Sequence, residues 1–174
     1  RVYVADVAYA DSAFFNVFSI PLISGEKNTV LKYSNSIVIS QRIAQIFFGN
    51  EDPLGKTLNY DNRRDYVVTG VMGPMPGKSH FSYDIYMADN HVNNKWIENG
   101  FCTYWKVKPG YNPEDISTKV NNIAFAALEK SLSDMLAITP NKFLDQGNTY
   151  NYGYQSIEKV YLNSNLQYEL RPNS

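Results

Sequence analysis

The triplet Gly55, Lys56 and Thr57 has the composition of a phosphate-binding loop, in which backbone N–H groups and a lysine hold nucleotide phosphates. Such a loop also needs a glycine five positions before its second glycine, and Asn50 stands there. The residues after Lys56 predict a strand, whereas phosphate binding uses the N-terminus of a helix. The sequence therefore predicts no nucleotide site at this triplet.

A second group of residues has the types that supply a nucleophile and a base. Ser79 and His80 are neighbours, and Asp84 follows four residues later. Neighbouring side chains on a strand point to opposite faces, so Ser79 and His80 cannot make the mutual hydrogen bond that this chemistry requires. We interpret His80 as a surface or loop histidine and expect no catalytic residue here.

Metal ligands are scarce. Cys102, His80 and His91 are the only cysteine and histidines, too few for a zinc site of the Cys/His type. We interpret Cys102 as a small buried apolar side chain. The adjacent carboxylates Glu51 and Asp52 precede a proline turn, and Glu114 and Asp115 open a helix, so each pair has a structural explanation. We expect no bound metal, no cofactor and no enzymatic activity, and the sequence identifies no residue that contacts a substrate or partner.

The composition narrows the class of protein. The chain has 174 residues, with 16 Lys+Arg against 17 Asp+Glu and no dense basic run, which argues against a nucleic-acid-binding surface. Its 14 Tyr and 19 Asn are typical of hydrated contact surfaces, but we favour a bias in overall composition over a dedicated carbohydrate site as their explanation. The longest nearly apolar stretch, residues 14–23, is too short to cross a bilayer. The chain opens on the strand-like residues 1–5 without an initiator Met, so we expect an excised or processed piece without a signal peptide.

The first half of the chain predicts strands that alternate with short helices. We expect a strand over 2–9, then a short helix through Phe18 that Asp11 or Ser12 caps and Pro21 ends. We further expect a strand over 36–39, a helix capped by Ser40 and stopped by Gly49, a hairpin of 56–60 and 65–71 around a short Asp/Asn turn, and a strand over 81–87. Phe14, Phe15 and Phe18 are expected to anchor the first helix in the core.

The second half predicts one long helix among weaker elements. Asn112 and Pro113 give a strong helix start, and the residues expected on the buried stripe are Ile116, Val120, Ile123, Ala127 and Met135. We also expect a short helix over 92–97 and strands over 101–108, 150–154 and 156–162. The whole pattern predicts an α+β fold, with mixed sheets and a few helices, whose subdomains meet at 73–77 or 88–100.

Four segments in order resemble one family. They are residues 11–25 (DSAFFNVFSIPLISG), 36–40 (SIVIS), 48–56 (FGNEDPLGK) and 66–71 (YVVTGV), followed by the closing residues 160–164 (VYLNS). The chain resembles the MacB-like periplasmic core domain of FtsX-like ABC transporter permeases. The resemblance is close over residues 1–87, whereas residues 88–155 match only in the order of elements.

The resemblance implies a fold with two named parts. Residues 11–87 would form a Sabre-like part, and residues 1–10 with 88–174 a Porter-like part that lacks its first βαβ unit. It also implies a non-enzymatic domain on the periplasmic side of the inner membrane, between the first two transmembrane helices of a permease, that couples ATP-driven movement to an exported substrate or periplasmic partner.

The same resemblance implies the partners. They are the protein's own transmembrane helices and a cognate ATPase subunit or domain, with a periplasmic adaptor as a further candidate, in a dimeric parent transporter that binds no nucleic acid. The alternative is a free-standing secreted module that binds a glycan or peptide through its Tyr and Asn side chains.

Overall fold

The computed structural model describes residues 3–74, 81–89, 101–136, 139–147, 149 and 152–163. The chain divides into two compact units, residues 1–91 with 168–174 and residues 92–167, so the first boundary falls inside the polar stretch 88–100. The described part of the first unit is residues 3–89, and that of the second unit is residues 101–163.

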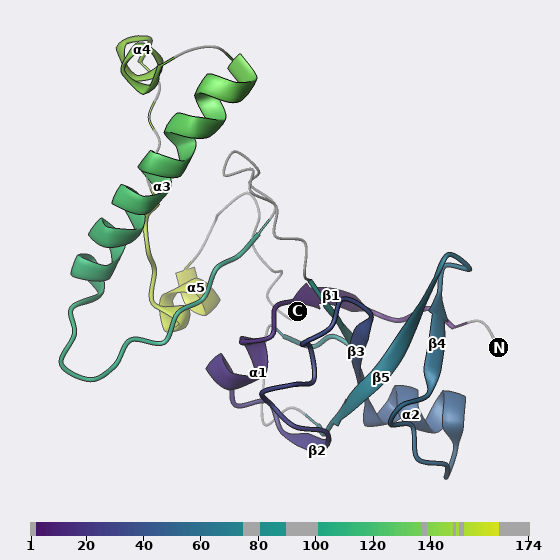
Figure 1. The fold of residues 1–174 in the computed structure, drawn as a ribbon. Helices are drawn as coiled ribbons and strands as arrows, with labels where there is room; N and C mark the ends of the chain where they lie inside the picture. Colours follow the sequence, from purple (N-terminus) through teal and green to yellow (C-terminus); the bar gives the residue numbers. More distant parts are fainter. Residues whose placement is uncertain are drawn as a thin grey trace. The chain divides into compact units, whose positions relative to one another are not determined.

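The first unit is built on one mixed sheet (Figure 1). Its strands are β1 (Val7–Ala10), β2 (Leu22–Ser24), β3 (Ser36–Ser40), β4 (Thr57–Tyr60), β5 (Arg64–Met72) and β6 (Ile85–Ala88). The order across the sheet is β1-β6-β3-β5-β2, and β4 also pairs with β5. β1 is parallel to β6 and β3 to β5, while the other pairs are antiparallel. The predicted α+β fold with a mixed sheet is confirmed.

Strand periodicity divides the core into two layers, one on each face of the sheet. On β3, Ile37 and Ile39 point to one face and Val38 to the other, and all three are at most 1% exposed. β3 is therefore a central strand buried on both faces, which explains its unbroken apolar sequence. On β6, Ile85 and Met87 join the first layer, and Tyr86 and Ala88 join the second.

Short helices cover the two faces. α1 (Phe14–Val17) carries the buried Phe15 into the layer that contains Val38 and Tyr86. α2 (Gln41–Phe48) places the fully buried Ile43 in the opposite layer. The predicted cap of α2 is confirmed, because the Ser40 hydroxyl accepts a hydrogen bond from the Ile43 N–H at 3.2 Å. The predicted cap of α1 is not seen; Asp11 instead accepts from the Ala13 N–H, just before the helix.

The β4–β5 hairpin is confirmed, and its turn uses Asp61 and Asn62 with φ of 57° and 54°. Asp and Asn tolerate this left-handed conformation better than most residues, which suits them to the turn. Gly25 follows β2, which pairs with β5, and it has φ of 96°. A Cβ at this position would lie 2.5 Å from the Thr69 carbonyl oxygen of β5, so the site requires glycine. Strand β2 itself was not expected, because three residues give little periodic signal.

The second unit consists of α3 (Pro113–Leu136), α4 (Pro140–Asp145), α5 (Ile157–Asn163) and the segments that join them (Figure 1). The predicted start of α3 is confirmed, with the Asn112 side chain accepting a hydrogen bond from the Glu114 N–H at 3.1 Å. The predicted buried stripe is only partly right. Ala124 and Leu128 are the buried positions, whereas Ile123 is 61% exposed.

Several expectations for the second unit are wrong. Residues 101–108 and 152–154 form no strand, because alternation of apolar residues makes a strand only where another strand pairs with it, and the described part of this unit contains none. The strand expected over 156–162 is wrong, because residues 157–162 form most of α5, in which Ile157, Val160 and Tyr161 recur at helical spacing. Cys102 is exposed, not buried. The helix expected over 92–97 lies outside the described residues.

Candidate functional site

The structure confirms that a strand follows Lys56, since β4 begins at Thr57. The Lys56 ammonium forms an ion pair with Glu51 and lies 5.3 Å from the centre of the Phe48 ring. The hydrogen bond from Lys56 lowers the pKa of Glu51. Lys56 thus ties the turn after α2 to the start of the hairpin, which is a structural role.

The other candidate residues fall into two groups. Ser79, His80 and His91 lie outside the described residues. The carboxylates have structural roles: Asp52 accepts from the Leu54 N–H at 3.0 Å, and Glu114 and Asp115 occupy the first turn of α3. Within the ranges that the structure describes, no group of His, Cys, Asp and Glu side chains could hold a metal ion.

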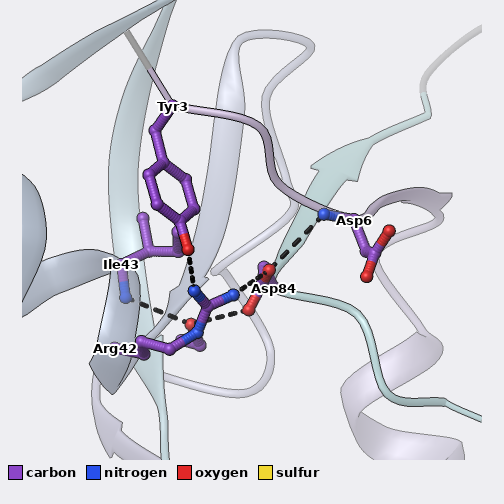
Figure 2. Close-up of polar contacts among 6 residues, drawn as sticks. Tyr3, Asp6, Arg42, Ile43 and Asp84 are labelled. Carbon is purple, nitrogen blue, oxygen red and sulfur yellow. Dashed lines mark hydrogen bonds and ion pairs between the residues drawn. The ribbon is translucent and has the colours of Figure 1, made fainter. Parts of the chain in front are cut away.

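Asp84 belongs to a polar cluster that the sequence did not reveal (Figure 2). The Arg42 guanidinium donates from Nη1 to the Tyr3 hydroxyl and from Nη2 to Asp84 Oδ2. Asp84 also accepts from the Asp6 N–H at 3.4 Å and from the Ser40 hydroxyl at 3.4 Å. We call these five residues the N-terminal bridge. Hydrogen bonds to Asp84 and to Tyr3 raise the pKa of Arg42.

Backbone pairing holds the members of the N-terminal bridge together. The N–H groups of Asp84 and Ile85 both donate to the Asp6 carbonyl, at 2.9 and 3.1 Å, and the Ser40 N–H donates to the Asp84 carbonyl at 2.7 Å. Ser40 caps α2, so Arg42 is held in the first turn of that helix. The Ser40 cap is visible in the sequence and places Arg42 in the first turn of a helix. No local signal pairs Arg42 with Asp84, which lies 42 residues further along the chain.

A second cluster is aromatic and consists of Tyr60 on β4 and Tyr66 on β5. The rings of Tyr60 and Tyr66 meet edge to face at 6.3 Å, and the Arg64 guanidinium lies 5.3 Å from the centre of the Tyr66 ring. Burial, followed by the nearby phenol groups of Tyr66 and Tyr60, raises the pKa of Tyr9. Tyr9 on β1 is nevertheless 57% exposed and Tyr60 37%, so these two rings present aromatic surface, whereas Tyr66 is buried.

In the second unit, Asn121 acts as a hydrogen-bonding clasp for the extended segment before α5. Its side-chain oxygen accepts from the Tyr152 N–H at 2.7 Å, and its side-chain nitrogen donates to the Tyr152 carbonyl at 2.9 Å. Ser117 donates to the same carbonyl at 3.2 Å. Nearby, burial and then Glu114 raise the pKa of Tyr154. These contacts hold chain segments in place and supply no reactive group.

None of the helices in the described residues is both long enough and apolar enough to span a membrane. The polar clusters described above join segments of the chain to one another, and the tyrosine cluster is suited to contact.

Residues 2–123 match the model of the MacB-like periplasmic core domain. No curated protein sequence matches the chain closely enough to count as a relative. One similar solved structure is a domain assigned to a permease protein from Porphyromonas gingivalis, with 23% identity, TM-score 0.49, and coverage of 67% of this chain and 57% of that one.

Two further structures are similar at lower TM-scores. The periplasmic region of MacB from Actinobacillus actinomycetemcomitans has 18% identity and TM-score 0.43 over 81% of this chain and 64% of that one. The extracellular domain of the noncanonic ABC-type transporter YknZ from Gram-positive bacteria has 22% identity and TM-score 0.39, over 57% and 53%. This chain thus spans less than two thirds of each solved domain, and the assignment to a family rests on the sequence match.

Proposed function

Because the chain belongs to the MacB-like periplasmic core domain family, we propose that it couples ATP-driven movement of an FtsX-like ABC transporter permease to an exported substrate or a periplasmic partner. The domain performs this role without catalysis. The observation that carries the proposal is the family match over residues 2–123, which includes the whole sheet of the first unit. The structural roles of Lys56 and Asp84 support it, since two residues considered for chemistry are engaged in holding the fold.

The proposal includes the surroundings of the domain. It lies on the periplasmic side of the inner membrane, joined to its own transmembrane helices, and works with a cognate ATPase subunit or domain in a dimeric transporter. A periplasmic adaptor is a further partner in this scheme. The chain itself neither binds nor hydrolyses ATP, because a strand follows Lys56 where phosphate binding needs a helix N-terminus.

The division into Sabre-like residues 11–87 and Porter-like residues 1–10 and 88–174 is part of the same proposal. The pairing of β1 with β6 brings residues 7–10 beside residues 85–88, where the Porter-like part would resume. In the structure, residues 3–10 belong to the same compact unit as residues 11–89. The last residue of the first Porter-like segment, Ala10, thus pairs with Ala88, where the second Porter-like segment would begin.

The first test is the reading frame that encodes the chain. The proposal expects four apolar spans of about 20 residues in the parent, the first before residue 1 and the second after residue 174. A parent without such spans would overturn the proposal and favour the free-standing secreted module. A glycan array combined with a thermal-shift screen would then identify the ligand, because a ligand that binds only the folded state raises the melting temperature.

The second test measures coupling in the reconstituted transporter. The exposed Cys102 is first replaced by Ser, and single cysteines are placed at the exposed positions Asn122 or Glu129 of α3 to trap a reversible disulfide between paired copies. We expect the disulfide to change ATPase activity and to shift nucleotide affinity by about 5–150-fold, because coupling between two sites is reciprocal. Reduction should restore both values. Unchanged activity and affinity in the oxidised transporter would reject mechanical coupling and leave a passive docking surface.

A further inference from the structure

The N-terminal segment, residues 3–6, leads into a strand that is easily detached. β1 has four residues and lies at the end of the strand order, and among the strands that the structure describes it pairs with β6 alone. A short edge strand pulled from its end loses its hydrogen bonds one at a time, because each bond bears the load in turn. The contacts ahead of β1 therefore decide how much pull the strand itself receives.

Those contacts are made by the N-terminal bridge. Arg42 is bonded to the Tyr3 hydroxyl and to Asp84, and its guanidinium lies 5.3 Å from the centre of the Tyr3 ring. Asp84 in turn is bonded to the backbone of Asp6. Figure 2 shows that Arg42 reaches between Tyr3 and Asp84, so one side chain connects the N-terminal segment, the first turn of α2 and the residue before β6.

The exposure of the bridge argues against a main role in stability. The side chain of Arg42 is 52% exposed and that of Asp84 16%, and ion pairs this open to solvent add little to equilibrium stability because water and salt screen them. A contact that adds little to equilibrium stability can still slow detachment, if it is the first contact that the applied force must break. The contacts of Arg42 with Tyr3 and Asp84 are thus better suited to resist an applied force than to raise the free energy of unfolding.

We propose that the Tyr3–Arg42–Asp84 contact is a latch that bears force applied to the N-terminal segment and passes it to α2 and β6 before the β1–β6 pairing is loaded. Its use in a transporter rests on the proposed function, because there the pull would come from the membrane. The latch itself is a property of this chain and can be measured without any transporter.

The test is a single-molecule pulling experiment on the 174-residue chain. Cys102 is replaced by Ser, and handles are attached at cysteines introduced at position 1 and at the exposed Asn50, just beyond α2. We expect a first opening event that releases about ten residues, roughly 3 nm of chain, before the sheet unfolds. Arg42→Met keeps a long apolar stem and good helix propensity but removes the guanidinium.

With Arg42→Met, the first event should occur at a lower force, with an opening rate at fixed load raised roughly tenfold. Tyr3→Phe, which removes only the hydroxyl, should raise the rate less, and it also serves as the test if Arg42→Met does not fold. The matched control is Arg63→Met, which removes an exposed arginine in the turn between β4 and β5 and should leave the event unchanged.

Two results would overturn the latch. One is the same detachment force in the parent, Arg42→Met and Tyr3→Phe chains, and the other is the absence of a separate first event in the parent. Either result leaves the proposed function standing, because other contacts could couple the domain to the membrane. Conversely, a parent gene without membrane spans would remove the proposed function and leave the measured latch intact.

Discussion

At the scale of single residues, Phe15 is the main anchor of α1. Its side chain is 1% exposed, and its ring meets those of Phe14 and Tyr86 edge to face at 5.5 and 5.7 Å. Phe15→Ala should lower the free energy of unfolding by about 3–5 kcal/mol, because the side chains around Phe15 cannot fill so large a cavity. Urea denaturation followed by circular dichroism gives the value.

Phe18→Ala provides the comparison on the same short segment. Phe18 packs on Phe14 and Phe81 at 4.9 and 4.3 Å between ring centres, yet it is only partly buried. Its loss should therefore cost less than that of Phe15. An unchanged denaturation midpoint in both variants would mean that the phenylalanine cluster is an exposed contact patch rather than core.

Tyr86 makes the fold sensitive to alkaline pH. Burial raises the pKa of the Tyr86 phenol, whose hydroxyl donates to the Phe81 carbonyl at 3.0 Å. Because the pKa is higher in the folded chain than in the unfolded one, this contribution to stability is complete below about pH 10 and declines as the pH rises toward the folded value.

The variant Tyr86→Phe should remove this decline, which reaches at most about 1.4 kcal/mol per pH unit. At neutral pH it should cost about 0.5–1.5 kcal/mol for the lost hydrogen bond. Melting temperatures between pH 8 and about 11 test both expectations. Tyr33→Phe is the control, since Tyr33 is 63% exposed. Equal alkaline slopes in the parent and Tyr86→Phe would contradict the assignment.

At the scale of elements, the Asn121 clasp fixes the segment before α5 against α3. Asn121→Ala removes both bonds that this side chain makes to the Tyr152 backbone. We expect the amide of Tyr152 to exchange with solvent roughly tenfold faster, as a loss of about 1–1.5 kcal/mol would give. Hydrogen exchange measured by NMR reads this directly.

Asn122→Ala is the matched control for the clasp, since Asn122 is the next residue of α3 and is exposed. It should leave exchange at Tyr152 unchanged. Equal rates in Asn121→Ala and Asn122→Ala would mean that the segment is held by apolar contacts and not by the clasp.

At the scale of the whole molecule, the two units should differ in stability. Within the described ranges, the fully buried apolar side chains belong to the first unit, apart from Ala124 and Leu128 on α3. Hydrophobic burial drives folding, so the second unit should open at lower free energy. We expect amides of α3 to show at least about tenfold lower protection from hydrogen exchange than those of β3 and β5. Equal protection would indicate that the two units unfold as one.

The sequence by itself determined the elements whose signals are local. The unbroken apolar run of β3, the Ser40 cap of α2, the Asp61–Asn62 turn of the hairpin and the Asn112 start of α3 all appear in the structure as expected. Each depends on residues within a few positions of one another, so local conformational preference is enough to fix it. The ordered segments that resembled the periplasmic core domain also led to the correct family.

Only the tertiary structure decided which segments pair as strands and which distant side chains bond to one another. Apolar and polar residues alternate over 101–108 as in a strand, but no strand of the described chain pairs with this segment. Residues 22–24, in contrast, become β2 because β5 pairs with them. The N-terminal bridge joins Tyr3, Arg42 and Asp84, which lie far apart in the sequence. Pairing and bridging depend on distances that chain folding sets, and no local propensity encodes them.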